Sequence, residues 1–585
     1  MKSSREQSKN HNFENSISIK GQVWVERENN SDLEKKLIQT FNSNIVFSKL
    51  LSKRNMSINQ LQDYFNPKIK NILPDPNVFD GMEIATEKIV DLIQKKKKIG
   101  IFGDYDVDGS SATALLKNYF DEIGIESEFY IPDRQEEGYG PNVNAFKKLI
   151  TNRCEIIITL DCGTTSINEI RFAKDNNIEV IIVDHHKEGQ KLPEAFSIIN
   201  PNKKKDNSKF KNLCATAVTF FLVISINRKL KKIKFFKNSS PNLIKFLDLV
   251  ALATICDVMK LDLLNRAFVK QGLKVLNQTQ NLGLQILCNE SQLNNEVNDY
   301  HLGYILGPRI NAGGRMGESP LAAKLLSTNE KSLAIKFSRK LNNFNLLRKQ
   351  VEKKVENEAS KLVKDNEQII CVNSKGWHEG VIGIVASKLT EKFNRPSIVI
   401  SEQESSSKAS CRSVANFDIG ELIIKGIQCG IIESGGGHKM AGGFSIKSEK
   451  IHLLKEFVSS SYKKGRSDII KYYDSEIKIS SINYDLYRQI ESLSPFGPGN
   501  SRPKFLVKDC FIKYSKIVGD YHFSCVLEDI YGNEIRGIAF NFAKYNVSEI
   551  LNKQGLEVSV IASLQLNNWN EKEAIEFQIQ DMFLC

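Results

Sequence analysis

The sequence predicts an α/β protein with two α/β lobes joined by a long helix, followed by an all-β domain. Short strands rich in Ile and Val alternate with helical segments between residues 98 and 183, and a second alternation runs from 368 to 400. A charged helical pattern covers 320–364, and beyond 461 the chain consists of short β-like pieces separated by turns. Because alternating strands and helices are typical of a parallel sheet covered by helices, we expect such a sheet in the first lobe.

Length and composition set the outer limits of the interpretation. A chain of 585 residues is long enough for about three or four domains, and its 41% hydrophobic and 26% charged residues exclude global disorder. Lys and Arg number 81 against 69 Asp and Glu, a net charge of +12 that permits a polyanionic partner without requiring one. The 11 cysteines are scattered and contain no C-x-x-C pair, which fits neither a disulfide framework nor a zinc knuckle.

The sequence contains neither a membrane span nor a secretory signal. Its longest apolar stretch, 213–226, is too short to cross hydrocarbon and is expected to be a buried helix. The polar N-terminus has no apolar core of the kind that a signal peptide needs. We therefore expect a cytoplasmic protein with no membrane partner.

Changes in composition divide the chain into five parts. They are a flexible polar tail at 1–45, a first α/β domain with an N-terminal helical lead-in at 46–319, a connecting helix at 320–364, a second α/β domain at 365–460, and an all-β domain at 461–585. The connecting segment has no Pro or Gly after its start and is dense in charge, which is typical of a solvated helix.

Acidic side chains follow three predicted parallel strands, and another follows an apolar helix. They are Asp104, Asp106 and Asp108 after the first strand, Asp161 after the second, Asp184 with His185 and His186 after the third, and Asp257 after the helix. Parallel strands bring their carboxyl ends to one edge of a sheet, so these residues can converge. Such carboxylates repel one another unless a cation neutralises them. Taken singly, the first group could be an acidic turn, and Asp257 could cap a turn.

Carboxylates with one or two imidazoles form a mixed oxygen and nitrogen site. This donor set suits Mn²⁺ or Mg²⁺, and the number of ligands is sufficient for two ions. The absence of cysteine ligands from these motifs argues against structural zinc. A two-metal site can activate water and stabilise charge on an attacked phosphorus, so we expect hydrolysis of a phosphoester or phosphoanhydride bond.

The order and spacing of these motifs resemble those of the DHH phosphoesterase superfamily. Further segments resemble its bacterial single-strand-specific 5′→3′ DNA exonucleases. They are IPDR at 131–134 with EGYG at 137–140, PRINAGGR at 308–315, GWHEGVIG at 376–383, and GGGH at 435–438 with Gly442 and Gly443. The resemblance extends from about residue 77 to the C-terminus. It implies that the first lobe is a DHH catalytic domain, the second a smaller DHH-associated substrate-binding domain, and the all-β end a nucleic-acid-binding OB-fold.

The resemblance also implies functional residues. The metal site would consist of Asp104, Asp106, Asp108, Asp161, His185 and Asp257, all of them catalytic, with His186 near the attacked phosphate. Some relatives carry a metal-binding His where this chain has Phe102, and Asp104 is expected to substitute for it. The implied substrate-binding residues are Arg134, Tyr139, Arg309, Asn311, Arg315, His378, Gly436, Gly437 and His438.

Two of these implications have a direct physical basis. Glycine lets backbone N–H groups approach an anion closely, so 435–443 is a candidate phosphate-binding loop, with a flexible turn as the alternative. In an OB-fold, aromatic side chains stack on bases, and Phe496, Tyr521 and Phe540 are candidates for this contact. Aromatic residues in a small barrel can equally belong to its core.

The function implied by the resemblance is removal of 5′-mononucleotides from single-stranded DNA, in repair and recombination, with a helicase and a single-strand-binding protein as candidate partners. An oligonucleotide or cyclic-dinucleotide phosphodiesterase of the superfamily would share the acidic motifs, but it would not need the all-β end. A pyrophosphatase would be shorter. A non-catalytic strand-binding factor would not need every motif carboxylate, and all of them are present here.

Overall fold

The computed structural model divides the chain into two compact units. The large unit consists of residues 73–259 and 264–465, and the small unit of 1–72, 260–263 and 466–585. The residues that the structure describes are 17–41, 44–54, 56–278, 280–461, 469–519, 521–543, 545, 547–551, 553–567 and 573–584. Among them, no helix has the length and apolar character needed to cross a membrane.

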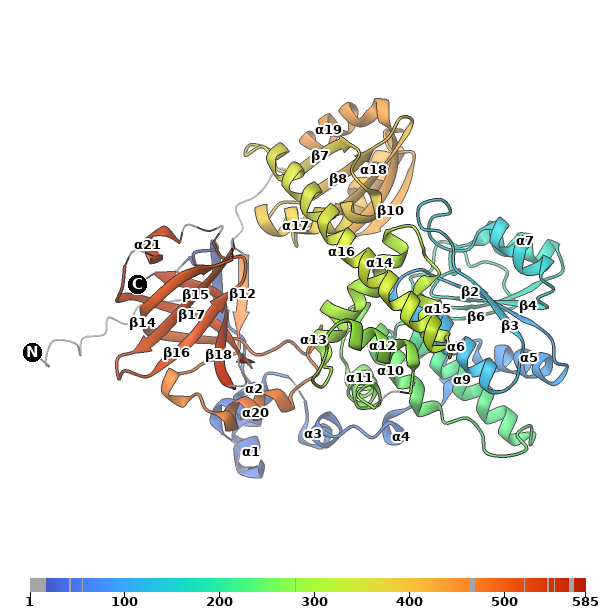
Figure 1. Cartoon of the computed structure of the whole chain (residues 1–585), viewed down its shortest axis with the longest axis horizontal. Coiled ribbons are helices and arrows are strands. Elements are labelled where there is room, and N and C mark those ends of the chain that lie inside the picture. The colour runs from blue at the N-terminus through green and yellow to red at the C-terminus, as the bar shows by residue number, and fades with distance from the viewer. Residues whose placement is uncertain are drawn as a thin grey trace, which may run out of the picture. The chain divides into compact units, whose positions relative to one another are not determined.

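The first lobe of the large unit contains the predicted parallel sheet (Figure 1). Its strands, in spatial order, are β3 (Ser127–Tyr130), β2 (Ile99–Gly103), β4 (Ile156–Leu160), β5 (Glu179–Val183) and β6 (Ser197–Ile199). All four pairings are parallel. The residues of β2 and β4 are buried throughout, as expected for continuous Ile-rich strands that helices cover on both faces.

Helices cover both faces of this sheet. They are η2 (Pro76–Val78), α5 (Met82–Gln94), α6 (Val107–Glu122), α7 (Val143–Thr151), α8 (Ile167–Asp175) and α9 (Ala215–Lys232). On one face, Phe146 of α7 and Ile170 of α8 pack on Phe102, Ile157 and Ile182 of the strands. Helix α9 contacts β4 and β5 and is buried through most of its length, which confirms the prediction of a buried helix at 213–226.

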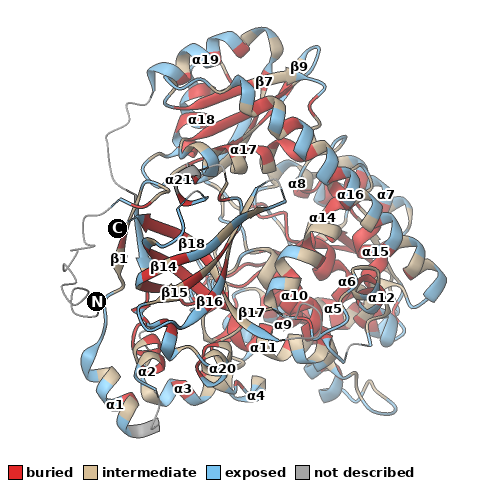
Figure 2. Ribbon diagram, turned by 60° about the vertical axis from the view of Figure 1, so that its left-hand side comes forward, coloured by how far each residue is buried: buried red, intermediate tan, exposed pale blue. Residues whose placement is uncertain are grey.

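A helical layer completes the first lobe. Its members are η3 (Leu243–Phe246), α10 (Leu247–Cys256), α11 (Leu263–Leu276), α12 (Leu282–Glu290), α13 (Asp299–His301), the π-helical turn η4 (Leu302–Leu306), α14 (Gly307–Arg315) and α15 (Leu321–Ser327). Helix α10 is buried from Leu247 to Thr254 and ends at Asp257, its C-terminal cap. Figure 2 shows buried residues along the helices of this lobe, among them α6, α9 and α10.

The predicted connecting helix at 320–364 begins later than expected: residues 321–327 form the separate helix α15, and the long helix is α16 (Lys331–Leu362), with 32 residues. Its length is about 48 Å at about 1.5 Å per residue. Its first half packs on α12, α14 and α15 of the first lobe. In its second half, Val355 and Ala359 belong to one hydrophobic cluster with Trp377 of the second lobe. The helix is therefore part of the core of both lobes.

The second lobe contains a mixed sheet in the order β10-β11-β9-β8-β7. Its elements are β7 (Ile370–Lys375), α17 (Glu379–Phe393), β8 (Ser397–Glu402), β9 (Ser406–Arg412), α18 (Ile419–Gln428), β10 (Ser434–His438), β11 (Ala441–Lys447), η5 (Ser448–Lys450) and α19 (Ile451–Ser460). The glycine cluster is a β-hairpin and not a loop, with Gly436 opposite Gly443 and Gly437 opposite Gly442. A Cβ on Gly437 would lie 2.6 Å from the Ala441 oxygen, so the close approach of the strands requires glycine there.

The all-β end is a closed barrel, as predicted. The barrel region comprises β13 (Ser475–Glu476), η6 (Ile479–Ser481), α20 (Tyr484–Ser492), β14 (Phe505–Val518), β15 (His522–Asp529), β16 (Glu534–Ala539), α21 (Ser548–Leu551), β17 (Leu556–Asn567) and β18 (Ala574–Leu584). Strand β14 pairs with both β15 and β17, which closes the sheet and leaves no open edge there. Phe505, Phe523 and Phe577 fill its interior.

The N-terminal segment corrects the predicted domain division. Residues 22–26 form β1 (Gln22–Glu26), which pairs in parallel with β12 (Ile469–Tyr473), and helix α1 (Ser31–Phe41) follows, where the sequence predicts a flexible tail. Helices α2 (Ile45–Ser52), α3 (Ile58–Phe65) and α4 (Ile69–Ile72) belong to the small unit, not to the first lobe. Local patterning cannot reveal this, because the partner strand is far along the chain. Residues 1–16 of the predicted tail lie outside the described residues.

Side chains from this segment complete the small unit. The Trp24 Nε1–H donates a hydrogen bond to Asp581 at 2.8 Å, and Leu50 and Leu61 lie in the same hydrophobic cluster as the barrel interior. Phe496 also belongs to this cluster and is only 8% exposed, with the Arg502 guanidinium 4.3 Å from its ring centroid. The prediction that Phe496 stacks on a base is therefore wrong, because its ring is already covered. Tyr521 and Phe540 are about half exposed, so base contact at these residues stays a prediction.

Candidate metal centre and phosphate-binding residues

The carboxyl ends of β2, β4 and β5 bring the predicted acidic residues together. His185 Nε2 lies 3.3 Å from an Asp161 carboxylate oxygen and 3.5 Å from one of Asp257. Asp108, His185 and Asp257 form one group whose ligand atoms lie within 4.8 Å of one another, and Asp104, Asp106 and Asp161 form another. The name acidic cluster is used below for the whole set, Asp104, Asp106, Asp108, Asp161, His185 and Asp257.

Local backbone geometry fixes these side chains. Asp106 is the N-cap of α6 and accepts a hydrogen bond from the Gly109 N–H at 3.0 Å. A Cβ on Gly109 would lie 2.6 Å from the Cβ of Asp104, so only glycine allows the strand end and the helix start to approach so closely. Asp161 has φ +64°, in the left-handed region that Asp adopts more readily than most residues.

Asp108 is held differently from the other acidic residues. Its carboxylate accepts hydrogen bonds from the N–H groups of Ala215 at 2.6 Å and Thr216 at 2.8 Å, at the start of α9. The Thr216 hydroxyl donates a third, at 2.6 Å. The N-terminus of α9 therefore compensates much of the Asp108 charge. The same carboxylate still lies 3.8 Å from His185 Nε2, so α9 positions it at the edge of the cluster.

The rest of the cluster carries charge that the protein does not compensate. Among the described residues, one buried oxygen each of Asp104, Asp161 and Asp257 has no hydrogen-bond partner. Burial raises the pKa of all three carboxyls and of Asp106, and the neighbouring carboxylates raise these pKa values further. Unpaired carboxylate oxygens beside one imidazole are the donor set of a hard divalent cation, so these residues fit Mn²⁺ or Mg²⁺.

Asp184 positions the histidine pair. Its carboxylate accepts hydrogen bonds from the N–H groups of His185 at 2.7 Å and Thr164 at 3.1 Å, and lies 2.8 Å from His186 Nδ1. Burial opposes ionisation of Asp184, but the hydrogen bond and charge of His186 hold the Asp184 pKa well below its usual range. Burial likewise opposes protonation of His186, yet Asp184 raises the His186 pKa to about 9. The Tyr139 hydroxyl donates to the Asp161 carbonyl at 2.9 Å and lies 3.2 Å from His186 Nδ1.

Sequence reasoning missed two residues that support the histidine backbone. The Asn200 side-chain amide donates to the His186 carbonyl at 2.8 Å, and that of Asn202 donates to the His185 carbonyl at 2.6 Å. Both follow β6, whose carboxyl end lies at the same edge of the sheet as the other strand ends. Their position after a fourth strand was the signal that could have identified them.

Four arginines gather between the two lobes of the large unit. The name arginine cluster is used below for Arg134, Arg315, Arg348 and Arg412. Burial, together with the positive charges of the other three, lowers the pKa of Arg315 to about 10. The Arg315 guanidinium donates to the Gly380 carbonyl at 2.9 Å, which connects α14 to the start of α17. Arg348 forms an ion pair with Glu352 within α16.

Arg134 connects the two clusters. Its guanidinium lies 5.3 Å from the ring centroid of Tyr105, which stands between Asp104 and Asp106 in the sequence. The Arg134 charge opposes the rise in the Asp104 pKa, so the two side chains interact electrostatically. Sequence analysis predicted Arg134 and Arg315 as binding residues. It missed Arg348 and Arg412, because a single arginine on a helix or strand carries no distinctive local pattern.

The structure does not bring all the predicted binding residues to these clusters. His378 caps α17 and accepts a hydrogen bond at 3.0 Å from the N–H of Gly380, the residue whose carbonyl Arg315 contacts. Arg309 donates to Asn342 of α16 at 3.1 Å. Among the described contacts, Arg309, Asn311 and His438 make no hydrogen bond or ion pair with the acidic cluster. Gly436, Gly437 and His438 lie on the exposed strand β10.

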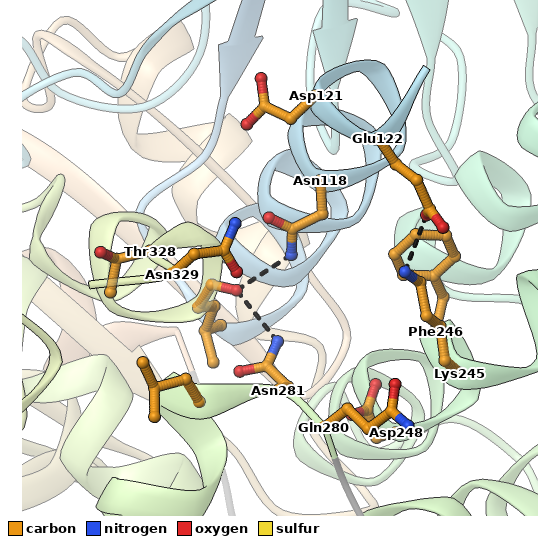
Figure 3. A pocket seen from close by; sticks show the side chains of 12 residues that line it. Asn118, Asp121, Glu122, Lys245, Phe246, Asp248, Gln280, Asn281, Thr328 and Asn329 are labelled. Atoms are coloured by element: carbon orange, nitrogen blue, oxygen red, sulfur yellow. Dashed lines mark hydrogen bonds and ion pairs between the residues drawn. The ribbon is translucent and has the colours of Figure 1, made fainter. Parts of the chain in front are cut away.

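A polar pocket of about 410 Å³ lies near the C-terminal end of α6 and the N-terminal end of α10 (Figure 3). It is lined by Asn118 and Glu122 near the end of α6, and by Asp248 near the start of α10. The acidic cluster is at the opposite ends of these helices. Lys245 pairs with Glu122 at 2.7 Å, and the amides of Asn118 and Asn281 both donate to the Leu326 carbonyl. Several lining groups thus satisfy one another, unlike those of the acidic cluster.

Three family profiles match successive parts of the chain. Residues 98–254 match the DHH family N-terminal domain, 366–464 the DHHA1 domain, and 473–581 the RecJ OB domain. The single-stranded-DNA-specific exonuclease RecJ of Haemophilus influenzae is 31% identical over 455 residues, which cover 75% of this chain and 79% of that protein. The protein of the same name from Bacillus subtilis is 29% identical over 571 residues, covering 95% and 70%.

Solved structures show the same fold. The crystal structure of RecJ from Thermus thermophilus in complex with Mn²⁺ superimposes with a TM-score of 0.82 at 23% identity, covering 96% of this chain and 79% of that one. A crystal structure of exonuclease RecJ bound to manganese has a TM-score of 0.58 at 28% identity, covering 65% and 94%. These likenesses confirm the α/β lobes and the terminal barrel that the sequence predicts.

Proposed function

The chain belongs to the RecJ family of single-stranded-DNA-specific exonucleases, and from this membership we propose that it hydrolyses single-stranded DNA from the 5′ end and releases 5′-mononucleotides. The observation that carries the proposal is the pairing, within one unit, of uncompensated buried carboxylates with a cluster of arginines. Such a pairing suits a metal-assisted reaction on a phosphodiester, because phosphate oxygens can bridge cations and guanidinium groups.

Two divalent ions, Mn²⁺ or Mg²⁺, fit the acidic cluster. Asp104, Asp106 and Asp161 would hold one ion, and Asp108, His185 and Asp257 the other, in line with two of the three groups whose donor atoms lie within 4.8 Å of one another. When bound, such ions activate water and offset the charge that develops on an attacked phosphate. Asp161 and His185 lie in direct contact, so the two groups adjoin each other.

The residues around the metal site would orient the substrate. His186 Nδ1 is engaged by Asp184 and Tyr139, which leaves Nε2 to contact the scissile phosphate. Arg134, Arg315 and Arg412 would bind the 5′-terminal phosphate, since guanidinium groups form strong paired hydrogen bonds with phosphate oxygens. His378, His438, Gly436 and Gly437 of the second lobe, with Arg309 and Asn311 of α14, remain candidates for contact with the strand.

The wider setting follows from the substrate. Single-stranded DNA is produced by unwinding and covered by single-strand-binding proteins, so a helicase and such a protein are the expected partners, in repair and recombination. The reaction would take place in the cytoplasm, where bacterial chromosomal DNA lies. We further propose domain limits of 73–319 for the DHH domain, 365–460 for the DHH-associated domain and 461–585 for the OB-fold, with 17–72 accompanying the barrel.

A strand labelled at either end tests the proposal. With Mn²⁺ or Mg²⁺, the wild type should release labelled mononucleotides from the 5′ end of a single-stranded oligonucleotide and leave a blunt duplex intact. Asp106→Ala should abolish this release while the chain remains folded by circular dichroism. Release from the 3′ end would refute the polarity. Hydrolysis of dinucleotides alone would favour the small-substrate phosphodiesterase.

A further inference from the structure

Two exposed tyrosines stack on each other at the surface of the large unit. Tyr300 of α13 and Tyr304 of η4 have ring centroids 5.0 Å apart and planes inclined by 24°. Tyr300 is 57% exposed and Tyr304 is 73% exposed. Residues four apart share one face of a helix, so the backbone holds the rings together. Two large aromatic rings in water are unfavourable for the free protein, which suggests that something covers them.

The segment that carries the tyrosines packs directly beside the acidic cluster. The Leu302 carbonyl accepts a hydrogen bond from the Cys256 thiol at 3.4 Å, and a Cβ on Gly307 would lie 2.5 Å from the same sulfur. A Cβ on Gly303 would lie 3.4 Å from Ile255. The glycines thus bring the π-helical turn against the two residues before Asp257. Single π-helical turns are frequent at functional sites.

An exposed apolar side chain lies directly beside Asp257 in the sequence. Val258 follows Asp257 directly and is 65% exposed, with φ +57°. The inward face of the tyrosine segment is closed by the buried side chains of Leu302 and Leu306. The tyrosine rings are therefore exposed on a segment whose opposite side packs against the residues that precede Asp257.

We propose that Tyr300 and Tyr304 form a stacking surface for a nucleobase of the single-stranded substrate, and that this contact contributes to the preference for single strands. This inference rests on the proposed function. Phosphate contacts alone cannot tell a single strand from a duplex, because both present phosphates. Bases can, because in a duplex they are stacked on their neighbours, whereas in a single strand their faces are available to aromatic side chains.

The test combines a change in the substrate with a change in the protein. The substrates are a 5′-phosphorylated oligonucleotide and an otherwise identical strand whose first few nucleotides lack bases. Loss of the bases should raise the KM of the wild type by roughly five- to a hundredfold, the range of base–aromatic stacking. Tyr304→Leu should raise the KM for the normal strand by a comparable factor and leave the KM for the abasic strand unchanged. Tyr304→Phe should retain the normal KM, because the ring remains.

A matched control separates the local effect from a general one. Phe196 is 38% exposed and precedes β6, at the amino edge of the sheet opposite the acidic cluster. Phe196→Leu should leave both KM values unchanged. If Tyr304→Leu affects the normal and abasic strands equally, or affects neither, the stacking role is refuted and the tyrosines serve as a docking surface for another protein or as a structural element.

A binding measurement keeps this inference distinct from the proposed function. A 2-aminopurine base near the 5′ end should lose fluorescence on binding to the wild type and to Tyr304→Phe, but not on binding to Tyr304→Leu. Quenching by a wild type that cuts no DNA would count against the exonuclease activity and leave the stacking role intact. A wild type that binds and cuts without quenching would overturn the stacking role alone.

Discussion

The acidic cluster and the arginine cluster are both concentrations of like charge, but they are assembled in opposite ways. All but one of the acidic cluster's residues follow strands of a single sheet, and Asp257 at the end of α10 completes it. The four arginines come from four different elements: a loop, α14, α16 and β9. The acidic half of the site is thus a property of one lobe, whereas the basic half is completed by Arg412 of the second lobe.

The two clusters also differ in how their charges are compensated. Among the described residues, buried oxygens of Asp104, Asp161 and Asp257 have no hydrogen-bond partner, and those of Asp161 and Asp257 have only the nearby imidazole of His185. Arg315 and Arg412 donate to the carbonyls of Gly380 and Cys411, and Arg348 pairs with Glu352. The arginines therefore keep hydrogen-bond or ion-pair partners in the free protein, although burial and mutual repulsion still disfavour the charge of Arg315. The uncompensated carboxylates make the metal-free protein less stable. Substitutions in the acidic cluster should therefore reduce hydrolysis more than substitutions in the arginine cluster.

The largest expected effect is the loss of hydrolysis in Asp161→Asn. Asn tolerates the left-handed conformation at this position and has nearly the same shape, so the backbone is preserved. One negative charge and a metal ligand disappear, and the initial rate should fall by about a thousandfold or more. The measurement is single-turnover cleavage of a single-stranded oligonucleotide across a Mn²⁺ titration. Near-normal activity at any metal concentration would exclude Asp161 as a ligand.

A smaller effect is expected in the basic half. Arg412→Ala should raise the KM for a 5′-phosphorylated strand by about ten- to a hundredfold, because a hydrogen bond to a charged group contributes about 1.5–3 kcal/mol. A 5′-hydroxyl strand should show little change, since it lacks the phosphate. Lys425→Ala, on the exposed face of α18, is the matched control. An equal effect on both strands would show that Arg412 supports the fold and does not bind the terminal phosphate.

Stability should respond in opposite directions to two buried aspartates. In the metal-free protein, Asp161→Asn should raise the free energy of unfolding by about 1–2 kcal/mol, because it removes repulsion between close carboxylates. Asp206→Asn should lower it by about 1–2 kcal/mol, because Asp206 is also buried but accepts from the N–H groups of Asp80 and Ser208. Urea unfolding in the presence of a chelator measures both. Destabilisation by Asp161→Asn would mean that its charge is already compensated.

The smallest effect is expected at the glycine hairpin. His438 is exposed on β10 and has no ion pair with either cluster among the described residues. We expect His438→Ala to change the KM for single-stranded DNA by less than about threefold, the level of a weak solvated contact. A larger increase in KM would indicate that the second lobe closes on the substrate and that the hairpin is part of the binding site.

The sequence predicts well the features that depend on a local pattern of residues, such as a strand and the site residue that follows it. Each Ile/Val-rich run that ends in Asp161 or Asp184 marks both a strand and a site residue, so the parallel sheet and its acidic edge could be predicted together. The pairing of β1 with β12 could not, because it depends on a partner distant in the sequence. The role of Arg412 could not be predicted for the same reason, because it arises only when the two lobes meet. Phe496 shows the limit of residue type, as an aromatic side chain suits a core and a base equally.

The continuous helix α16 also constrains how the length of this chain can vary. Each residue added to an α-helix advances it by about 1.5 Å and turns everything beyond it by about 100°. One inserted residue near the middle of Lys331–Leu362 would swing Arg412 and the rest of the second lobe away from the acidic edge. Seven residues, about two full turns, would restore the rotational phase but separate the lobes by about 10 Å. We therefore expect insertions among relatives to lie in loops and not in this helix. The number of residues in the helix fixes both the angle and the distance between the two lobes.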